Sequence, residues 1–212
     1  ITLATAAKNK VFLYGKPAKA KSKPSISKSK AFQEFKLKVS QGEQAEVEKI
    51  VSIYKSGDEG VSKPEKAALK HLDQYDSFEA ILKKSTKAWK KIWKEADVRV
   101  TGDRLAQKLL RLHIYHLMVA TSLHNKNIDA GIPARGLHGE AYRGHIFWDE
   151  LYILPFYYMH FPKVARSILE YRYRRLDKAR KYAKEYKYNG AMFPWQSGSD
   201  GQEETQIIHL NP

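Results

Sequence analysis

The first sixty residues alternate apolar and polar positions, the period of a β-strand. Alternating runs cover residues 11–14, 35–39 and 47–54, and lysines fill alternate positions of the middle run. Four turn-forming residues lie between the runs: Gly15, Pro17, Pro24 and Gly42. The pattern predicts strands with one buried and one solvated face. Because so few strands rarely fold as an independent sandwich, we expect them to pair with further sheet.

Beyond Pro64, apolar residues recur every three or four positions, which indicates helices. Two amphipathic helices are predicted between Pro64 and Trp93, and Asp76 and Ser77 are natural caps for the second. Trp89 and Trp93 lie one turn apart on its apolar face. We interpret them as packing residues in preference to a sugar platform.

Three longer helices are predicted for residues 103–124, 146–160 and 163–187. Asp103 can cap the first of them. The second is apolar nearly all round, so we expect it to be buried on more than one side. Pro155 lies inside it and predicts a kink or break.

Histidine and glycine positions refine this helical prediction. His113 and His116 lie three residues apart, a spacing that could bind a metal. No carboxylate-bearing motif accompanies them, so we favour a structural role and expect no metal. Gly190 suits a turn that terminates the third helix.

The composition is that of a globular protein. The chain has 212 residues, of which 42% are hydrophobic, enough for one full domain or for parts of two. No run approaches the roughly 20 apolar residues of a membrane span. With no signal peptide visible at Ile1, we expect a cytoplasmic protein without a membrane partner. The sequence has no cysteine, which excludes disulfides and thiolate chemistry.

The net charge of +15 is unevenly distributed, because the first thirty residues hold eight lysines and no acidic residue. A cluster of lysines could bind nucleic acid by releasing counterions from phosphates. A solvated, lysine-rich surface or linker at residues 16–24 explains the same pattern. We favour the second interpretation, since no nucleic-acid recognition motif accompanies the lysines.

Two glycine-rich loops, residues 135–149 and 191–205, combine ionisable and aromatic side chains more densely than a solvated turn requires. They follow the first and third long helices, so they would lie together if those helices pack as antiparallel pairs. Sugars present an apolar ring face and many hydroxyls, and their sites combine flat aromatics with carboxylates and amides. The residues that could supply such a site are Phe147, Trp148, Asp149, Trp195 and Gln196.

The alternative is that Trp148 and Trp195 anchor the core and that Asp149 caps the following helix. Cleavage of a glycosidic bond also needs two carboxyl groups that face each other across the anomeric carbon. The candidate carboxylates are Asp149, Glu150, Glu203 and Glu204. Supporting roles, in orienting these acids or binding substrate oxygens, are assigned to Arg135, Tyr142, Arg143, His145, Glu203 and Glu204.

Three ordered motifs, residues 132–150, 169–180 and 190–205, resemble glycoside hydrolase family 65. Residues 47–54 and 93–103 also look like this family, so the resemblance covers roughly residues 32–212. Its members are inverting phosphorylases and hydrolases of α-glucosidic disaccharides such as trehalose, maltose and kojibiose. The resemblance implies a mainly α fold with an N-terminal β segment, in which an incomplete β-sandwich and a helical linker precede part of an (α/α)6 barrel.

The expected boundaries are residues 1–62 for the end of the sandwich, 63–98 for the linker and 99–212 for the first part of the barrel. The resemblance places Phe147, Trp148 and Asp149 at the glucosyl subsite, with Trp195 and Gln196 nearby. It implies a disaccharide substrate, no cofactor, and inorganic phosphate as a co-substrate in a phosphorylase. Phosphorylase and hydrolase both remain open.

The family's general acid lies in a later barrel segment, so we expect it beyond Pro212 and expect this chain alone to be inactive. An open barrel would also expose apolar surface at about 25 cal/mol per Å². We therefore expect the chain to need the remainder of its polypeptide, or a second copy in a homodimer. A non-catalytic carbohydrate-binding or scaffolding protein is the alternative function, and nucleic-acid binding is a third.

Overall fold

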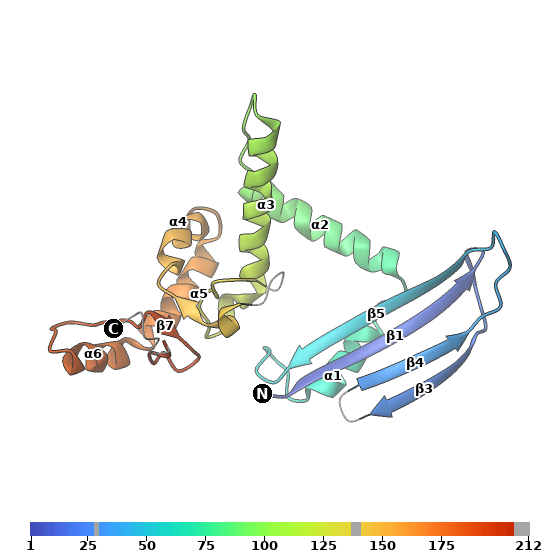
Figure 1. Cartoon of the computed structure of the whole chain (residues 1–212), viewed down its shortest axis with the longest axis horizontal. Coiled ribbons are helices and arrows are strands. Elements are labelled where there is room, and N and C mark those ends of the chain that lie inside the picture. Colours follow the sequence, from blue (N-terminus) through green and yellow to red (C-terminus); the bar gives the residue numbers. More distant parts are fainter. Residues whose placement is uncertain (28–29, 137–140, 206–212) are drawn as a thin grey trace. The chain divides into compact units, whose positions relative to one another are not determined.

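The computed structural model describes residues 1–27, 30–136 and 141–205 (Figure 1). The chain divides into two compact units, Ile1–Lys90 and Lys91–Pro212. The division falls inside the segment 63–98 that the sequence analysis assigns to a linker. Strands dominate the start of the chain, and within the described residues α1 to α6 all follow β5. The predicted class, mainly α with an N-terminal β segment, is confirmed.

A long antiparallel ladder organises the first unit. Strand β1 (Leu3–Leu13) pairs with β5 (Ala45–Lys55) from Leu3 opposite Lys55 to Leu13 opposite Ala45. The short β2 (Lys16–Pro17) adds to the other edge of β1. Strands β3 (Lys21–Ser27) and β4 (Lys30–Lys36) form a separate antiparallel pair.

The strands predicted at residues 11–14 and 47–54 are confirmed within β1 and β5, except that Tyr14, with φ 53°, lies beyond the end of β1. The strand predicted at 35–39 is wrong, because β4 ends at Lys36. Its proposed buried face is also absent, since Phe35 is the one half-buried residue of β4. Residues 16–24 are solvated as expected, but they contain β2 and the start of β3.

Helix α1 (Pro64–Leu72) packs against both β1 and β5 (Figure 1). The core between them is apolar and consists of Ala6, Ile50, Ala68 and Leu72. The same face of β5 carries Glu48, which accepts a 2.6 Å hydrogen bond from the Phe78 backbone N–H. This bond fixes the start of α2 (Phe78–Ala96). Ser77 caps that helix as predicted, because its Oγ accepts from the Ala80 N–H at 3.2 Å.

In the described residues of the second unit, helices and 3₁₀ turns accompany a two-residue ladder. Its elements are α3 (Arg104–Ala120), the 3₁₀ turns η1 (Leu123–Asn127) and η2 (Tyr142–Gly144), β6 (Ile146–Phe147), α4 (Glu150–His160), α5 (Pro162–Tyr173), α6 (Leu176–Glu185) and β7 (Gln196–Ser197). Asp103 caps α3 as predicted, accepting from the backbone N–H groups of Leu105 and Ala106 at 2.9 Å each.

The three long predicted helices have different bounds in the structure. The helix predicted over 103–124 ends at Ala120. The helix predicted from residue 146 begins at Glu150, because residues 146–147 pair as a strand with β7. Pro155 lies within α4, and the helix continues past it to His160. The helix predicted over 163–187 is two helices, separated where Arg175 leaves helical geometry at φ −107°.

The expected burial of α4 on more than one side is wrong for the described chain. Its Tyr157 is fully buried and donates a 2.6 Å hydrogen bond to the Leu117 carbonyl in α3. The helix also packs on α5, and the Nδ1 of His160 lies 2.7 Å from the Glu95 carbonyl in α2. Four large residues of α4 are nevertheless more than half exposed: Leu151, Tyr152, Tyr158 and Met159. No helix in the described residues has the length and apolar character needed to cross a membrane.

We expect Tyr157→Phe to lower the free energy of unfolding by about 1 kcal/mol, the usual net value of a buried hydrogen bond. The loss follows because the Leu117 carbonyl no longer has its hydroxyl donor. The hydroxyl lies in a buried environment, and this burial raises the pKa of Tyr157 to about 12. Urea unfolding measures the difference. Tyr158→Phe is the matched control, since Tyr158 is 61% exposed. Equal effects of the two substitutions would contradict the assignment.

Candidate functional site

The short β6–β7 ladder joins the two loops that the sequence analysis singled out. Ile146 lies opposite Ser197, and Phe147 lies opposite Gln196. Ser197 is fully buried, and its Oγ donates to the Ile146 carbonyl at 3.4 Å. The expectation that the two loops lie together is confirmed for their described residues.

An exposed pair of indole rings lies at one end of the ladder, next to Phe147 and Gln196. The ring centroids of Trp148 and Trp195 are 5.1 Å apart, with 38° between the ring planes. Trp148 also meets Tyr152 edge-on at 5.4 Å. The two tryptophans are 39% and 55% exposed, so they are not the core anchors of the alternative interpretation. Phe147, by contrast, is buried and meets the ring of Tyr142 at 5.0 Å.

Asp149 occupies the N-cap position of α4 but makes no side-chain cap bond. It is exposed, and within the described residues its carboxylate takes part in no hydrogen bond or ion pair. Asp149 therefore has the position of a helix cap, but the interpretation is wrong because its side chain makes no capping hydrogen bond. The carboxylate is left beside Trp148 as a solvent-accessible acceptor, and the half-buried Gln196 lies on the paired strand.

Glu150, the next residue, lies in a different environment. Its side chain is 2% exposed, and one carboxylate oxygen pairs with the guanidinium Nε of Arg172. Burial raises the pKa of Glu150, although the charge of Arg172 opposes the shift. The Glu150 carboxylate is therefore buried against Arg172, next to the ladder. It is not free to face Asp149 across a substrate.

Glu203 closes the second loop on itself. Its carboxylate accepts hydrogen bonds from the backbone N–H of Trp195 at 2.7 Å, of Gln196 at 3.2 Å and of Thr205 at 3.0 Å, and from the Thr205 hydroxyl at 2.5 Å. Burial raises the pKa of Glu203, but these bonds outweigh it and the pKa is lowered. The side chain therefore sets the backbone of the two proposed sugar-contacting residues.

His145 links the first loop to the second. Its Nε2 lies 2.7 Å from the Glu204 carboxylate, and its Nδ1 lies 2.7 Å from the Tyr142 carbonyl. The hydrogen bond with Glu204 is the largest cause of a raised His145 pKa. Tyr142 and Arg143 both have positive φ, at 59° and 52°, an uncommon conformation for residues other than glycine.

Arg135, the remaining supporting residue, lies with its guanidinium 6.0 Å from the centre of the Tyr142 ring. The predicted loop between them includes residues 137–140, which lie outside the described residues. Within the described residues, no group of three or more histidine, aspartate or glutamate side chains could hold a metal ion.

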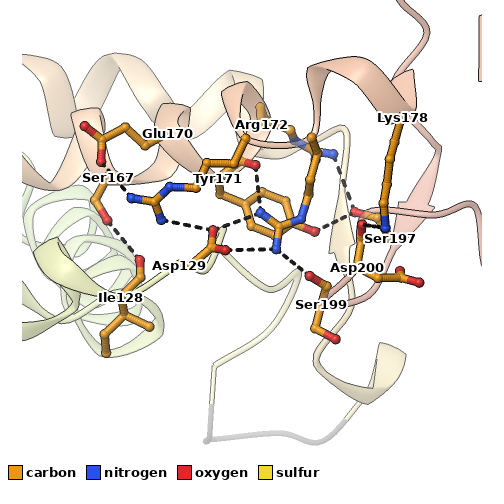
Figure 2. Close-up of polar contacts among 12 residues, drawn as sticks. Ile128, Asp129, Ser167, Glu170, Tyr171, Arg172, Lys178, Ser197, Ser199 and Asp200 are labelled. Atoms are coloured by element: carbon orange, nitrogen blue, oxygen red, sulfur yellow. Dashed lines mark hydrogen bonds and ion pairs between the residues drawn. The ribbon is translucent and has the colours of Figure 1, made fainter. Parts of the chain in front are cut away.

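Sequence reasoning missed the side chains at the end of α5, and in the turn that follows it, that support both loops (Figure 2). Tyr171 is 1% exposed, and its hydroxyl donates to the Gly198 carbonyl at 2.5 Å. Arg175 pairs with Asp129 at 2.8 Å and also donates to the Ser199 carbonyl. The signal available in the sequence was the three- and four-residue spacing of Tyr171, Arg172 and Arg175, three side chains with polar groups beside an apolar stripe. The sequence analysis assigned this segment to packing.

A separate pocket of about 340 Å³ lies between α6 and the back of the second loop. Lys181, Tyr182, Gln202 and Glu203 are among its lining residues, whereas Trp148 and Asp149 are not. The exposed tryptophan pair is therefore a surface platform and not the wall of this pocket.

Known proteins resemble the chain along most of its length. Residues 1–92 match the glycosyl hydrolase family 65 N-terminal domain, and residues 111–212 match the family's central catalytic domain. An uncharacterised glycosyl hydrolase of Mycobacterium tuberculosis is 38% identical over 212 residues, which are 100% of this chain and 16% of the relative.

Two other relatives are named as phosphorylases of particular disaccharides. A kojibiose phosphorylase of Halothermothrix orenii is 39% identical over 182 residues, covering 81% of this chain and 23% of the relative. A trehalose 6-phosphate phosphorylase of Lactococcus lactis is 44% identical over 138 residues, covering 64% of this chain and 18% of the relative. The chain thus spans less than a quarter of the length of these relatives.

The fold has a solved counterpart, a protein from the human microbiome provisionally named a kojibiose phosphorylase. It superposes with a TM-score of 0.64 at 25% identity, covering 94% of this chain and 28% of that one. Two family domains in the expected order, relatives along the whole chain and a matching fold agree with one another. The chain belongs to glycosyl hydrolase family 65.

Proposed function

We propose that this chain supplies the glucose-binding subsite of an inverting phosphorylase or hydrolase of α-glucosidic disaccharides, of the kojibiose, trehalose or maltose type. The observation that carries the proposal is the exposed Trp148–Trp195 pair beside the unengaged Asp149 carboxylate. An aromatic face and an anionic acceptor are complementary to the two sides of a glucose ring. The phosphorylases among the relatives support the same substrate class.

Each residue has a stated role in this proposal. Trp148 stacks on the non-reducing glucose, and Asp149 accepts hydrogen bonds from its hydroxyls, while Trp195 and Gln196 contact it from the paired loop. Phe147 contributes from below, as a buried support. Inorganic phosphate, or water in a hydrolase, attacks on the face opposite the leaving sugar. The reaction needs no cofactor.

The same proposal extends to the architecture. Residues 1–62 would belong to a β-sandwich, residues 63–98 to a helical linker and residues 99–212 to an (α/α)6 barrel. The family matches to an N-terminal and a central catalytic domain support this order. We also propose that the complete protein is cytoplasmic and forms a homodimer.

A second candidate function, carbohydrate binding without catalysis, has its own supporting observation. Three of the four candidate carboxylates are engaged: Glu150 by Arg172, Glu203 by its own loop and Glu204 by His145. Within the described residues, Asp149 therefore has no free carboxylate partner among these candidates. Glucose binding without turnover in the complete protein would favour this second function.

We expect Asp149→Asn to weaken glucose binding about tenfold or more, because a hydrogen bond to a charged group is worth about 1.5–3 kcal/mol. Tryptophan fluorescence follows the titration. Asp177→Asn is the control, since that side chain is 96% exposed on α6 and pairs only with Arg180 in the described structure. Unchanged affinity in Asp149→Asn would remove Asp149 from the subsite.

Incubation of the complete protein with kojibiose, trehalose or maltose separates the two proposed reactions. A phosphorylase releases glucose 1-phosphate only when inorganic phosphate is present, whereas a hydrolase releases glucose without it. We expect phosphate-dependent release from one of the three sugars, because the named relatives are phosphorylases. Binding of glucose without either product contradicts catalysis and supports the second candidate.

Glucose affinity should fall as the pH rises, because the His145–Glu204 bond joins the two halves of the subsite. The raised pKa of His145 means that the charged bond stabilises the fold fully below about pH 6.5 and is lost as the pH passes the raised value.

Thermal unfolding and glucose titration at about pH 6 and pH 9 measure this dependence. We expect Glu204→Gln to remove most of it, because the amide carries no charge. His113→Gln, at an exposed histidine of α3, should keep the wild-type dependence. An identical pH profile in Glu204→Gln and in the unmodified protein would contradict the role of this bond.

A further inference from the structure

Arg172 contacts the chain on both sides of the proposed sugar-binding dipeptide. Its Nε pairs with the carboxylate of Glu150, the residue after Asp149. Its Nη2 donates to the carbonyl of Phe147, the residue before Trp148, at 3.3 Å. A single planar guanidinium therefore contacts the residue before Trp148 and the residue after Asp149, and so holds this dipeptide at both ends.

The same side chain reaches the second loop. Its Nη1 lies 3.5 Å from the hydroxyl of Ser197, which follows Trp195 and Gln196 in the sequence. The neighbouring Tyr171 hydroxyl lies 3.2 Å from that Ser197 hydroxyl and donates to the Gly198 carbonyl. Figure 2 shows Tyr171, Arg172 and Ser197 meeting at this point. Tyr171 and Arg172, adjacent residues near the end of α5, thus contact both loops.

The guanidinium of Arg172 lies in a largely buried site. The side chains of Arg172 and Glu150 are 15% and 2% exposed. The guanidinium lies 5.5 Å from the centre of the Tyr171 ring and 5.7 Å from that of Phe193. A planar fork with several donors can make these contacts together, whereas the single ammonium of lysine cannot.

We propose that Arg172 is a positioning residue, which sets Trp148 and Asp149 against Trp195 and Gln196 without touching the sugar itself. The significance for sugar binding rests on the proposed function. The claim about geometry does not, because the distance between the two tryptophan rings can be followed with no sugar present.

The variants are Arg172→Lys, Arg172→Met and the double variant Glu150→Gln/Arg172→Met. The coupled circular dichroism of the Trp148–Trp195 pair, identified as the signal that Trp195→Phe removes, reports the geometry. Thermal unfolding reports stability, and fluorescence titration with glucose reports function. Arg180→Lys and Arg180→Met are matched controls, because Arg180 is exposed and pairs only with Asp177 in the described part of α6.

We expect the Arg172 variants to lose at least half of the coupled signal and to bind glucose about tenfold more weakly, since small displacements of positioning residues have effects of this size or larger. The double variant removes both buried charges and should regain thermal stability. Its coupled signal and affinity should stay low, because the bonds to Phe147 and Ser197 are still missing.

Recovery of the coupled signal together with stability in the double variant would overturn the proposal and leave Arg172 a support of the fold alone. Wild-type signal in a folded Arg172→Lys would overturn it equally. If no Arg172 variant folds, the residue is required for folding and the positioning proposal also fails. If the unmodified protein binds no glucose, the proposed function fails, while the coupled signal still decides the role of Arg172.

Discussion

The ion pair between Arg172 and Glu150 is the interaction on which the arrangement of the second unit depends. Removing two charges from water costs several kcal/mol per ion, which is recovered only when geometry and further hydrogen bonds are good. Here the guanidinium also bonds to the Phe147 carbonyl and lies within reach of Ser197. A two-residue ladder has little stability of its own. The contacts from α5 therefore add to the stability of the β6–β7 pairing.

This support separates the roles of acidic residues that look alike in the sequence. Glu150 faces inward to an arginine, Glu203 collects backbone N–H groups of its own loop, and Glu204 meets His145 across the two loops. Asp149, one position from Glu150, faces solvent instead. Because the helix begins between them, adjacent carboxylates point into different environments and acquire different chemistry. Glu150, Glu203 and Glu204 therefore hold the loops in place, and the carboxylate of Asp149 remains accessible to a ligand.

The first unit uses polar contacts in a similar way. Glu48 lies on the buried face of β5 and binds the first backbone N–H of α2. Lys8, on the same face of the sheet, donates to the Tyr75 carbonyl at 2.6 Å. The connection between α1 and α2 is thereby attached to the sheet by charged side chains, while the apolar core beneath α1 consists of small and medium residues.

The sequence by itself determined the order of strands and helices, the caps at Ser77 and Asp103, and the membership in the family. These features depend on local periodicity, on side chains bonding to nearby backbone, and on motifs read in order. It missed the end of β4, the division of the third long helix at Arg175, and the exposure of α4, because each depends on which surfaces meet.

Only the tertiary structure decided that Trp148 and Trp195 form an open pair, that Phe147 is buried, and that Tyr171 and Arg172 support them. These residues lie in three segments, and more than twenty positions separate each segment from the next. Burial and pairing are properties of the folded contacts, which no spacing in the sequence records. The sequence supplied the residue types for a sugar site, and the packing of α5 against two loops decided where each one faces.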